Sequence, residues 1–76
     1  MSPRNPPDPR LGPALRALRE QLDVTQEDIA YEAGISAAAL SHIETSRSNP
    51  AWTTVLRIAE ALEVSLGELV EAVESA

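Results

Sequence analysis

Residues 24–45 read VTQEDIAYEAGISAAALSHIET, a stretch that predicts two short helices separated by one glycine. The expected helices cover residues 26–33 and 36–45, with Gly34 between them. Glycine readily adopts the left-handed backbone conformation that ends a helix, so this residue can stop the first helix and begin a tight turn. The stretch therefore predicts a helical pair joined at a fixed angle.

Both helices have a start signal in the sequence. Thr25 is a typical N-cap, with Asp28 at the third helical position as in a capping box. Val24 and Ile29 lie on either side of this start and can pack as a hydrophobic staple. The same cap and staple spacing repeats eleven residues later in Ile35, Ser36 and Leu40.

The second helix has a buried side and a contrasting outer face. Leu40 and Ile43 mark the buried side. The helical period places the following residues on the opposite face: Ala38, Ser41, His42 and Thr45. This outer face is small, polar and uncharged, and a helix held by a tight turn can present such a face to the major groove of DNA.

Residues 11–70, about four fifths of the chain, resemble the helix-turn-helix domain of phage repressor and Cro proteins, also called the xenobiotic-response-element family. The matching segments, in the family's order and spacing, are LRALRE (15–20), TQEDIA (25–30), GIS (34–36), LSHIE (40–44), NP (49–50) and LRIAEALEVS (56–65). The resemblance implies an all-α, five-helix, lambda-repressor-like DNA-binding domain. Its helix-turn-helix is formed by helices two and three.

The resemblance also implies a set of DNA-binding residues. They are Gln26, Ser36, Ala37, Ala38, Ser41, His42, Thr45, Arg47, Ser48 and Asn49. In the family, a glutamine at position 26 contacts a phosphate and braces the recognition helix; the alternative for Gln26 is an ordinary exposed side chain. Position 42 often reads a base in the family; the alternative for His42 is a solvated surface histidine. Alanines at 37 and 38 can touch only a thymine methyl group, so direct base readout is expected to be sparse.

The loop after the second helix contacts the phosphate backbone in the family. Arg47 is therefore expected at a phosphate, the alternative being a solvated charge. Ser46 replaces the family's usual glycine, and a left-handed serine would be strained. Ala51 replaces the usual serine cap of helix four. By the family's habit, we also expect an ion pair between Arg19 and Glu44.

The rest of the chain divides into an arm and a domain. Residues 1–9 are Pro-rich and are expected to form a disordered arm, and residues 10–76 the helix-turn-helix domain. The expected buried stripes are Leu11, Leu15, Leu18 and Leu22 in helix one, Val55, Leu56, Ala59 and Leu62 in helix four, and Leu66, Leu69, Val70 and Val73 in helix five, which starts at a Ser65 to Glu68 capping box.

Helix five has more apolar positions than a small core needs. We expect Trp52, Leu66, Val70 and Val73 to form a homodimer interface. The alternatives for the tryptophan are a place in the core and a role in base or ligand stacking. Dimerisation would also help a 76-residue chain, which buries only about 60% of its unfolded surface.

The net charge of −6 opposes the basic balance typical of DNA-binding proteins. The charge is polarised, however: residues 1–19 hold four arginines and one aspartate, a local +3, and residues 60–76 hold five glutamates and no base, a local −5. Acids on the far side of a small domain are largely screened from a bound duplex by salt, because the Debye length is about 8 Å.

Other functional classes lack the necessary residues. One histidine and no cysteine cannot build a multi-histidine or thiolate metal site, and no phosphate-binding glycine loop is present. Ser41 and His42 are neighbours but project in different directions from a helix, so they do not form a catalytic pair. We expect no enzyme activity, cofactor or small-molecule ligand. With no signal peptide or long apolar run, we expect no membrane association and a cytoplasmic protein.

The sequence thus predicts a DNA-binding transcription regulator that binds a palindromic operator as a homodimer. The resemblance extends to small stand-alone members such as restriction-modification controller proteins, and to phage-type repressors. The alternative is a protein-interaction or antitoxin-type module that keeps the fold with weak or no DNA binding, which the alanines and the net charge would permit.

Overall fold

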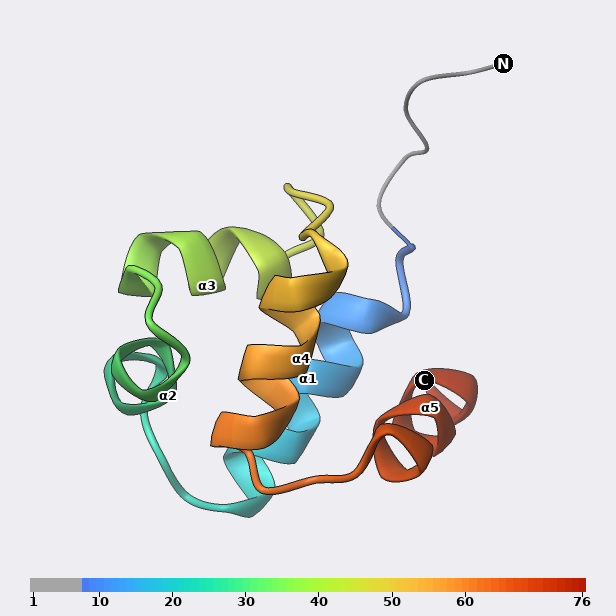
Figure 1. Cartoon of the computed structure of the whole chain (residues 1–76). Coiled ribbons are helices and arrows are strands. Elements are labelled where there is room, and N and C mark those ends of the chain that lie inside the picture. The colour runs from blue at the N-terminus through green and yellow to red at the C-terminus, as the bar shows by residue number, and fades with distance from the viewer. Residues whose placement is uncertain (1–7) are drawn as a thin grey trace.

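A computed structural model describes residues 8–76, and this part of the chain contains five helices and no strand (Figure 1). The helices are α1 (Leu11–Gln21), α2 (Gln26–Ala33), α3 (Ala37–Glu44), α4 (Trp52–Ala61) and α5 (Leu66–Ser75). The all-α prediction is confirmed. Most of the predicted N-terminal arm, residues 1–7, lies outside the described residues.

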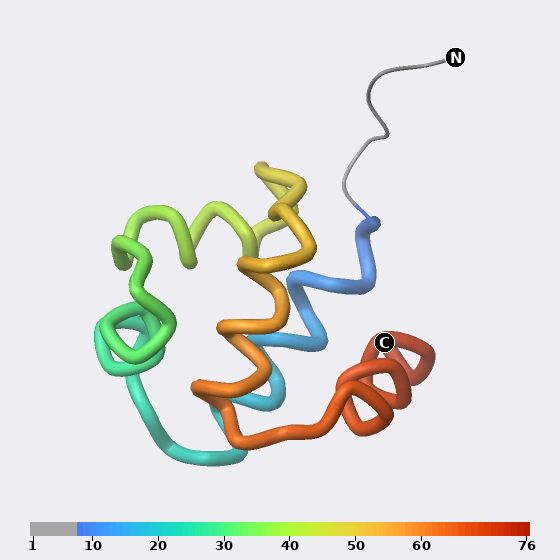
Figure 2. Tube along the Cα trace, viewed as in Figure 1, coloured from blue at the N-terminus to red at the C-terminus, as the bar shows by residue number. Residues whose placement is uncertain are grey.

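α1 and α4 overlap at the centre of the view in Figure 1, and the other three helices lie around them. In the tube view (Figure 2), α2 and α5 lie on opposite sides of this pair, and α3 runs across its end. Contacts follow the same arrangement: α2 packs against α4 and α3, whereas α1 packs against α5 and α3. α3 is therefore held from two sides, by α1 and by α2.

One hydrophobic core joins all five helices. Its fully buried side chains are Leu15, Leu40, Ile58 and Leu62. The expected stripe of helix one is wrong at its end, because Leu22 follows the last turn of α1 as its C-cap and is 45% exposed. In α4 the expected set omitted Ile58, which is completely buried, while Leu56 is only partly covered.

The helix boundaries follow the predicted capping signals. Thr25 and Ser65 form complete capping boxes with Asp28 and Glu68. The Glu68 carboxylate accepts a hydrogen bond from the backbone amide of Ser65 at 2.9 Å, and this lowers the pKa of Glu68 below its ordinary value. As predicted from Ala51, α4 begins without a side-chain cap.

Left-handed residues follow four of the described helices. Gly34 has the expected positive φ of 74°, and Ser46 is left-handed as well, with a φ of 61°. The other two, Asp23 and Glu63, have φ values of 57° and 59° and were not predicted to be left-handed. Three of these four positions therefore carry a side chain where glycine is preferred.

Candidate nucleic-acid interface

The turn between α2 and α3 is built as the sequence predicts. Gly34 donates its amide to Tyr31 O at 3.2 Å, and Ile35 donates to Ala30 O at 2.9 Å, so the last carbonyls of α2 are satisfied. The hydroxyl of Ser36 then accepts the Ala39 amide at 3.0 Å and starts α3. α3 covers Ala37–Glu44, one residue shorter at each end than expected.

α3 presents a mixed small and polar face to solvent. Ala38, His42 and Thr45 are exposed, and Ser41 is half-buried. Ala37 is also half-buried and packs against the core, so this residue contributes less to the outer face than expected. The opposite side of α3 is buried through Leu40 and Ile43, which fixes the direction in which the outer face points.

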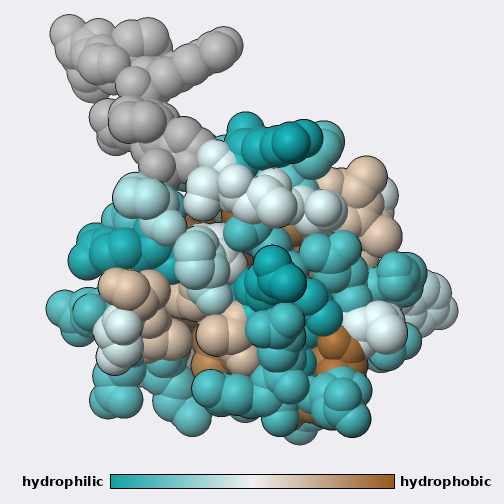
Figure 3. All heavy atoms as spheres, turned by 180° about the vertical axis from the view of Figure 1, so that it is seen from behind, coloured by the Kyte–Doolittle hydropathy of each residue, from teal (hydrophilic) through white to brown (hydrophobic). Residues whose placement is uncertain are grey.

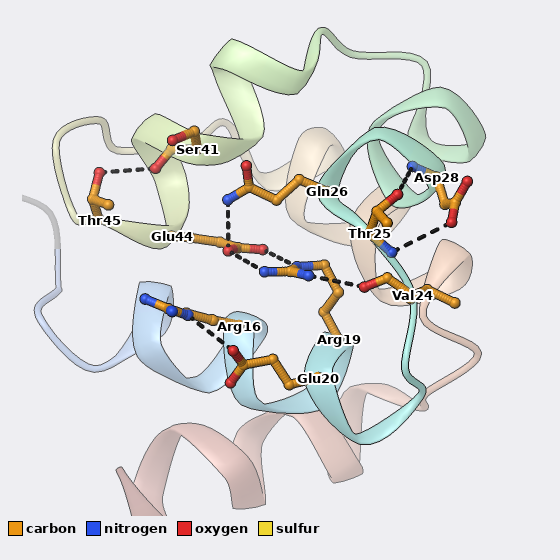
Figure 4. A network of polar contacts seen from close by, with 10 residues as sticks. All are labelled: Arg16, Arg19, Glu20, Val24, Thr25, Gln26, Asp28, Ser41, Glu44 and Thr45. Carbon is orange, nitrogen blue, oxygen red and sulfur yellow. Dashed lines mark hydrogen bonds and ion pairs between the residues drawn. The ribbon is translucent and has the colours of Figure 1, made fainter.

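A network of hydrogen bonds holds the last residue of α3 (Figure 4). The predicted ion pair is confirmed: Arg19 donates from Nε to Glu44 Oε2 at 2.8 Å and from Nη2 to Oε1 at 3.1 Å. Its third nitrogen, Nη1, donates to the carbonyl of Val24 at 2.8 Å. Hydrogen bonding to Glu44 raises the pKa of Arg19, and the side chains of the pair are only 13% and 2% exposed.

Gln26 completes this network from the first turn of α2. Its Nε2 donates to Glu44 Oε1 at 2.9 Å, so the brace that the resemblance implied between Gln26 and the second helix of the motif is present as a contact with α3. Gln26 remains half-buried, and its side-chain carbonyl has no partner in the described residues. The network ties α1 and α2 to the end of α3.

The loop after α3 leaves one cation free beside the helix. The Arg47 amide donates to His42 O at 2.8 Å and the Ser46 amide to Ile43 O at 3.1 Å, which closes the end of α3. The Arg47 side chain is exposed and makes no hydrogen bond or ion pair within residues 8–76. By contrast, Arg10 and Arg16 are held by neighbouring carboxylates.

Three of the four predicted dimer residues line one surface groove, and Leu66 lies outside its lining. Trp52, Val70 and Leu66 are 62%, 53% and 44% exposed, and Val73 is half-buried. A groove of about 510 Å³ runs between α1, α4 and α5, and its wall includes Trp52, Val70 and Val73. Leu69 of the expected α5 stripe is buried in the core and Val73 packs partly against it, so Leu66 and Val70 are the stripe residues that remain exposed for contacts.

Four acidic side chains gather away from α3. A second groove, of about 650 Å³, lies between α2 and α4 and is lined by Asp28, Glu32, Glu60 and Glu63. The back of the molecule (Figure 3) is mostly hydrophilic, with apolar residues in separate patches. The net negative charge is therefore not concentrated on the outer face of α3, which carries no acid.

Residues 8–76 contain neither a candidate metal site nor a candidate membrane-spanning helix. No group of three histidine, cysteine or carboxylate side chains there could hold a metal ion. No helix in the same range is long and apolar enough to cross a membrane.

The sequence did not indicate the close contact that Gly12 makes with the end of α3. Gly12, in the first turn of α1, is buried against the last turn of α3. The available signal was a glycine inside an expected helix, where alanine is ordinarily more stable.

The fold and the geometry of α2, the turn and α3 define a helix-turn-helix domain. Comparison with known families agrees, because the family described as "Helix-turn-helix domain" matches residues 10–73. The chain is 38% identical over 60 residues to y4dJ of Sinorhizobium fredii, described as an uncharacterised helix-turn-helix transcriptional regulator; the match covers 79% of this chain and 78% of y4dJ. The chain belongs to this family of helix-turn-helix transcriptional regulators.

Two further relatives are longer proteins that this chain matches only in part, and one solved structure has a similar fold. RghR of Bacillus subtilis, a transcriptional repressor, is 43% identical over 54 residues, which are 70% of this chain but only 40% of RghR. Antitoxin HipB of Escherichia coli K12 is 33% identical over 75% of this chain and 65% of HipB. The crystal structure of the restriction-modification controller protein C.AhdI from Aeromonas hydrophila aligns with a TM-score of 0.77 at 28% identity, over 80% of this chain and 92% of that one.

Proposed function

We propose that this chain is a sequence-specific transcription regulator that binds a palindromic DNA operator as a homodimer, with α3 in the major groove. The observation that carries the proposal is the presentation of α3. Its uncharged outer face is free, its last residue is fixed by Arg19 and Gln26, and the unpaired Arg47 lies next to it. A pre-positioned helix with a phosphate-binding cation beside it suits groove binding.

The exposed apolar residues support the dimeric form of this proposal. Trp52, Leu66 and Val70 are large side chains that a second copy can cover in a two-fold interface. Such a pair would place two recognition helices about 34 Å apart, one turn of DNA, and would bind two half-sites. Similarity to C.AhdI favours a restriction-modification controller as the narrower form of the proposal.

Selection from random-sequence DNA followed by affinity measurements tests the proposal. An enriched palindrome is expected. Replacing His42 with alanine should cost about 1 to 3 kcal/mol on that operator and little on random DNA, because a base contact is lost. Ala38→Glu should abolish binding, because it sets a carboxylate against the duplex.

Arg47 should act differently, as a phosphate contact. Arg47→Ala should weaken binding to all sequences alike and reduce the salt dependence by roughly one unit per subunit. Arg57→Ala is the matched control: Arg57 is also exposed and unpaired within residues 8–76, but it lines a pocket with Glu32 and Glu60 between α2 and α4. An equal effect of the two arginine variants would contradict the assignment.

The second candidate is an antitoxin-type or protein-interaction module. Ala37 and Ala38 on α3 and the net charge of −6 favour it, as does the similarity to antitoxin HipB. This candidate predicts that the protein retains no DNA in the selection even at low salt. Normal DNA binding by Ala38→Glu would instead mean that the protein binds DNA through a surface other than α3.

A further inference from the structure

The first turn of α1 lies directly against the last turn of α3. Gly12 lies in this contact, and a Cβ atom placed there would lie 2.5 Å from Ile43 O, 2.6 Å from Glu44 O and 2.9 Å from the Glu44 carbonyl carbon. Distances below 3.0 Å are essentially never seen for real Cβ atoms. All three neighbours are backbone atoms, so no side-chain rotation can relieve the overlap.

Local backbone conformation does not explain glycine at this position. Gly12 is helical and is not among the residues with positive φ, so an alanine would suit the helix better. Gly67 in α5 shows the contrast, because a Cβ there would meet only Ser65 Oγ at 3.8 Å, an ordinary contact. What requires glycine at position 12 is therefore the neighbouring helix.

The carbonyls that face Gly12 are connected to the DNA-facing side of the domain. Ile43 O accepts the amide of Ser46 at 3.1 Å, in the turn that leads to Arg47. Glu44 is the residue that Arg19 and Gln26 hold through its side chain. The side-chain network thus fixes where the end of α3 is attached, and the contact at Gly12 fixes how closely its backbone approaches α1.

We propose that Gly12 is a positioning residue that sets the depth and angle at which α3 is presented to DNA. The inference rests on the proposed function. A methyl group at position 12 requires the first turn of α1 and the last turn of α3 to separate by about half an ångström or more, since 2.5 Å has to become 3.0 Å or more, and we expect α3 to move. The outer face around His42 and the loop at Arg47 move with that turn.

The test compares Gly12→Ala with Gly67→Ala, the matched control with open space around the new methyl group. Amide resonances of residues 41–47 are recorded without DNA, and dissociation constants are measured on the selected operator and on random DNA. For Gly12→Ala we expect shifted amide resonances and a loss of about tenfold in the ratio of the two constants, comparable to one mismatched base pair. Gly67→Ala should change neither readout.

The ratio separates positioning from stability. A partly unfolded protein weakens binding to both DNAs by the same factor, so lost stability leaves the ratio unchanged. If Gly12→Ala alone does not fold, the same comparison is made in a background carrying Gly67→Ala and Glu63→Gly, two changes that relieve unfavourable backbone choices away from α3.

Two results would overturn the inference. Unshifted resonances in folded Gly12→Ala would mean that α1 moves and α3 does not. Shifted resonances with an unchanged ratio of dissociation constants would mean that recognition tolerates the displacement of α3. If the parent itself prefers no DNA sequence, the proposed function fails. The resonances measured without DNA still decide whether Gly12 positions α3.

Discussion

Replacing Glu44 with glutamine should destabilise the domain by about 3 to 5 kcal/mol, because it leaves Arg19 buried without its carboxylate. The Glu44 side chain is 2% exposed and accepts three hydrogen bonds, two from Arg19 and one from Gln26. A glutamine keeps one acceptor oxygen but turns its amide nitrogen toward another donor. The remaining oxygen cannot satisfy all three donors, and little water can reach them.

This loss is large compared with the whole stability of the domain. At about 0.05 to 0.15 kcal/mol per residue, the free energy of unfolding of a domain of this size is roughly 4 to 11 kcal/mol. The melting temperature should therefore fall by about 12 °C or more, because each kcal/mol changes the melting temperature of a small domain by about 4 to 8 °C. Thermal and urea unfolding followed by far-ultraviolet circular dichroism measure both quantities.

Glu20→Gln is the control for Glu44→Gln. It breaks the ion pair between Arg16 and Glu20, whose N–O distance is 3.3 Å and whose side chains are 59% and 57% exposed. Exposed pairs of this spacing contribute about 0.3 to 0.5 kcal/mol, so the melting temperature should barely change. Equal melting temperatures for Glu44→Gln and the parent would refute the reasoning about the buried network.

Three further predictions concern strain, titration and assembly. Ser46→Gly and Glu63→Gly should each raise the free energy of unfolding by about 1 kcal/mol, measured in urea, because both positions are left-handed. Arg10→Ala should return the pKa of Asp8 from about 2 toward 3.8 in an NMR titration, because the hydrogen bond from the Arg10 side chain is lost. In the parent, any stabilisation that comes from this lowered pKa is present above pH 3.8 and is lost as the pH falls through 2. Val70→Glu should convert a dimer into a monomer in sedimentation at tens of micromolar, whereas a parent that is already monomeric there would contradict the proposed interface.

The parts of the fold that local signals determine were predictable from the sequence. The α2 boundaries, the left-handed Gly34 and the caps at Thr25, Ser36 and Ser65 all follow from interactions within one turn of a helix. The Arg19 to Glu44 pair was predictable only through the family resemblance. Nothing local links two residues that lie 25 positions apart in the sequence.

The parts that were missed depend on neighbouring helices. A helical period shows which side of α1 is apolar, but not that the helix ends before Leu22 and leaves it at the surface. The burial of Ile58 was missed for a similar reason. Neighbouring helices cover a wider side of α4 than the apolar stripe that the sequence predicts. Gly12 was missed because its requirement comes from carbonyl groups of α3.

Trp52 gives the protein a built-in optical reporter. It is the single tryptophan of the chain, stands at the start of α4 beside the groove that α5 borders, and is 62% exposed in one copy. Indole emits at longer wavelength in water than in an apolar contact, so covering this side chain shifts its fluorescence to the blue. Self-association can therefore be followed with unlabelled protein over a dilution series, with no other tryptophan to obscure the signal.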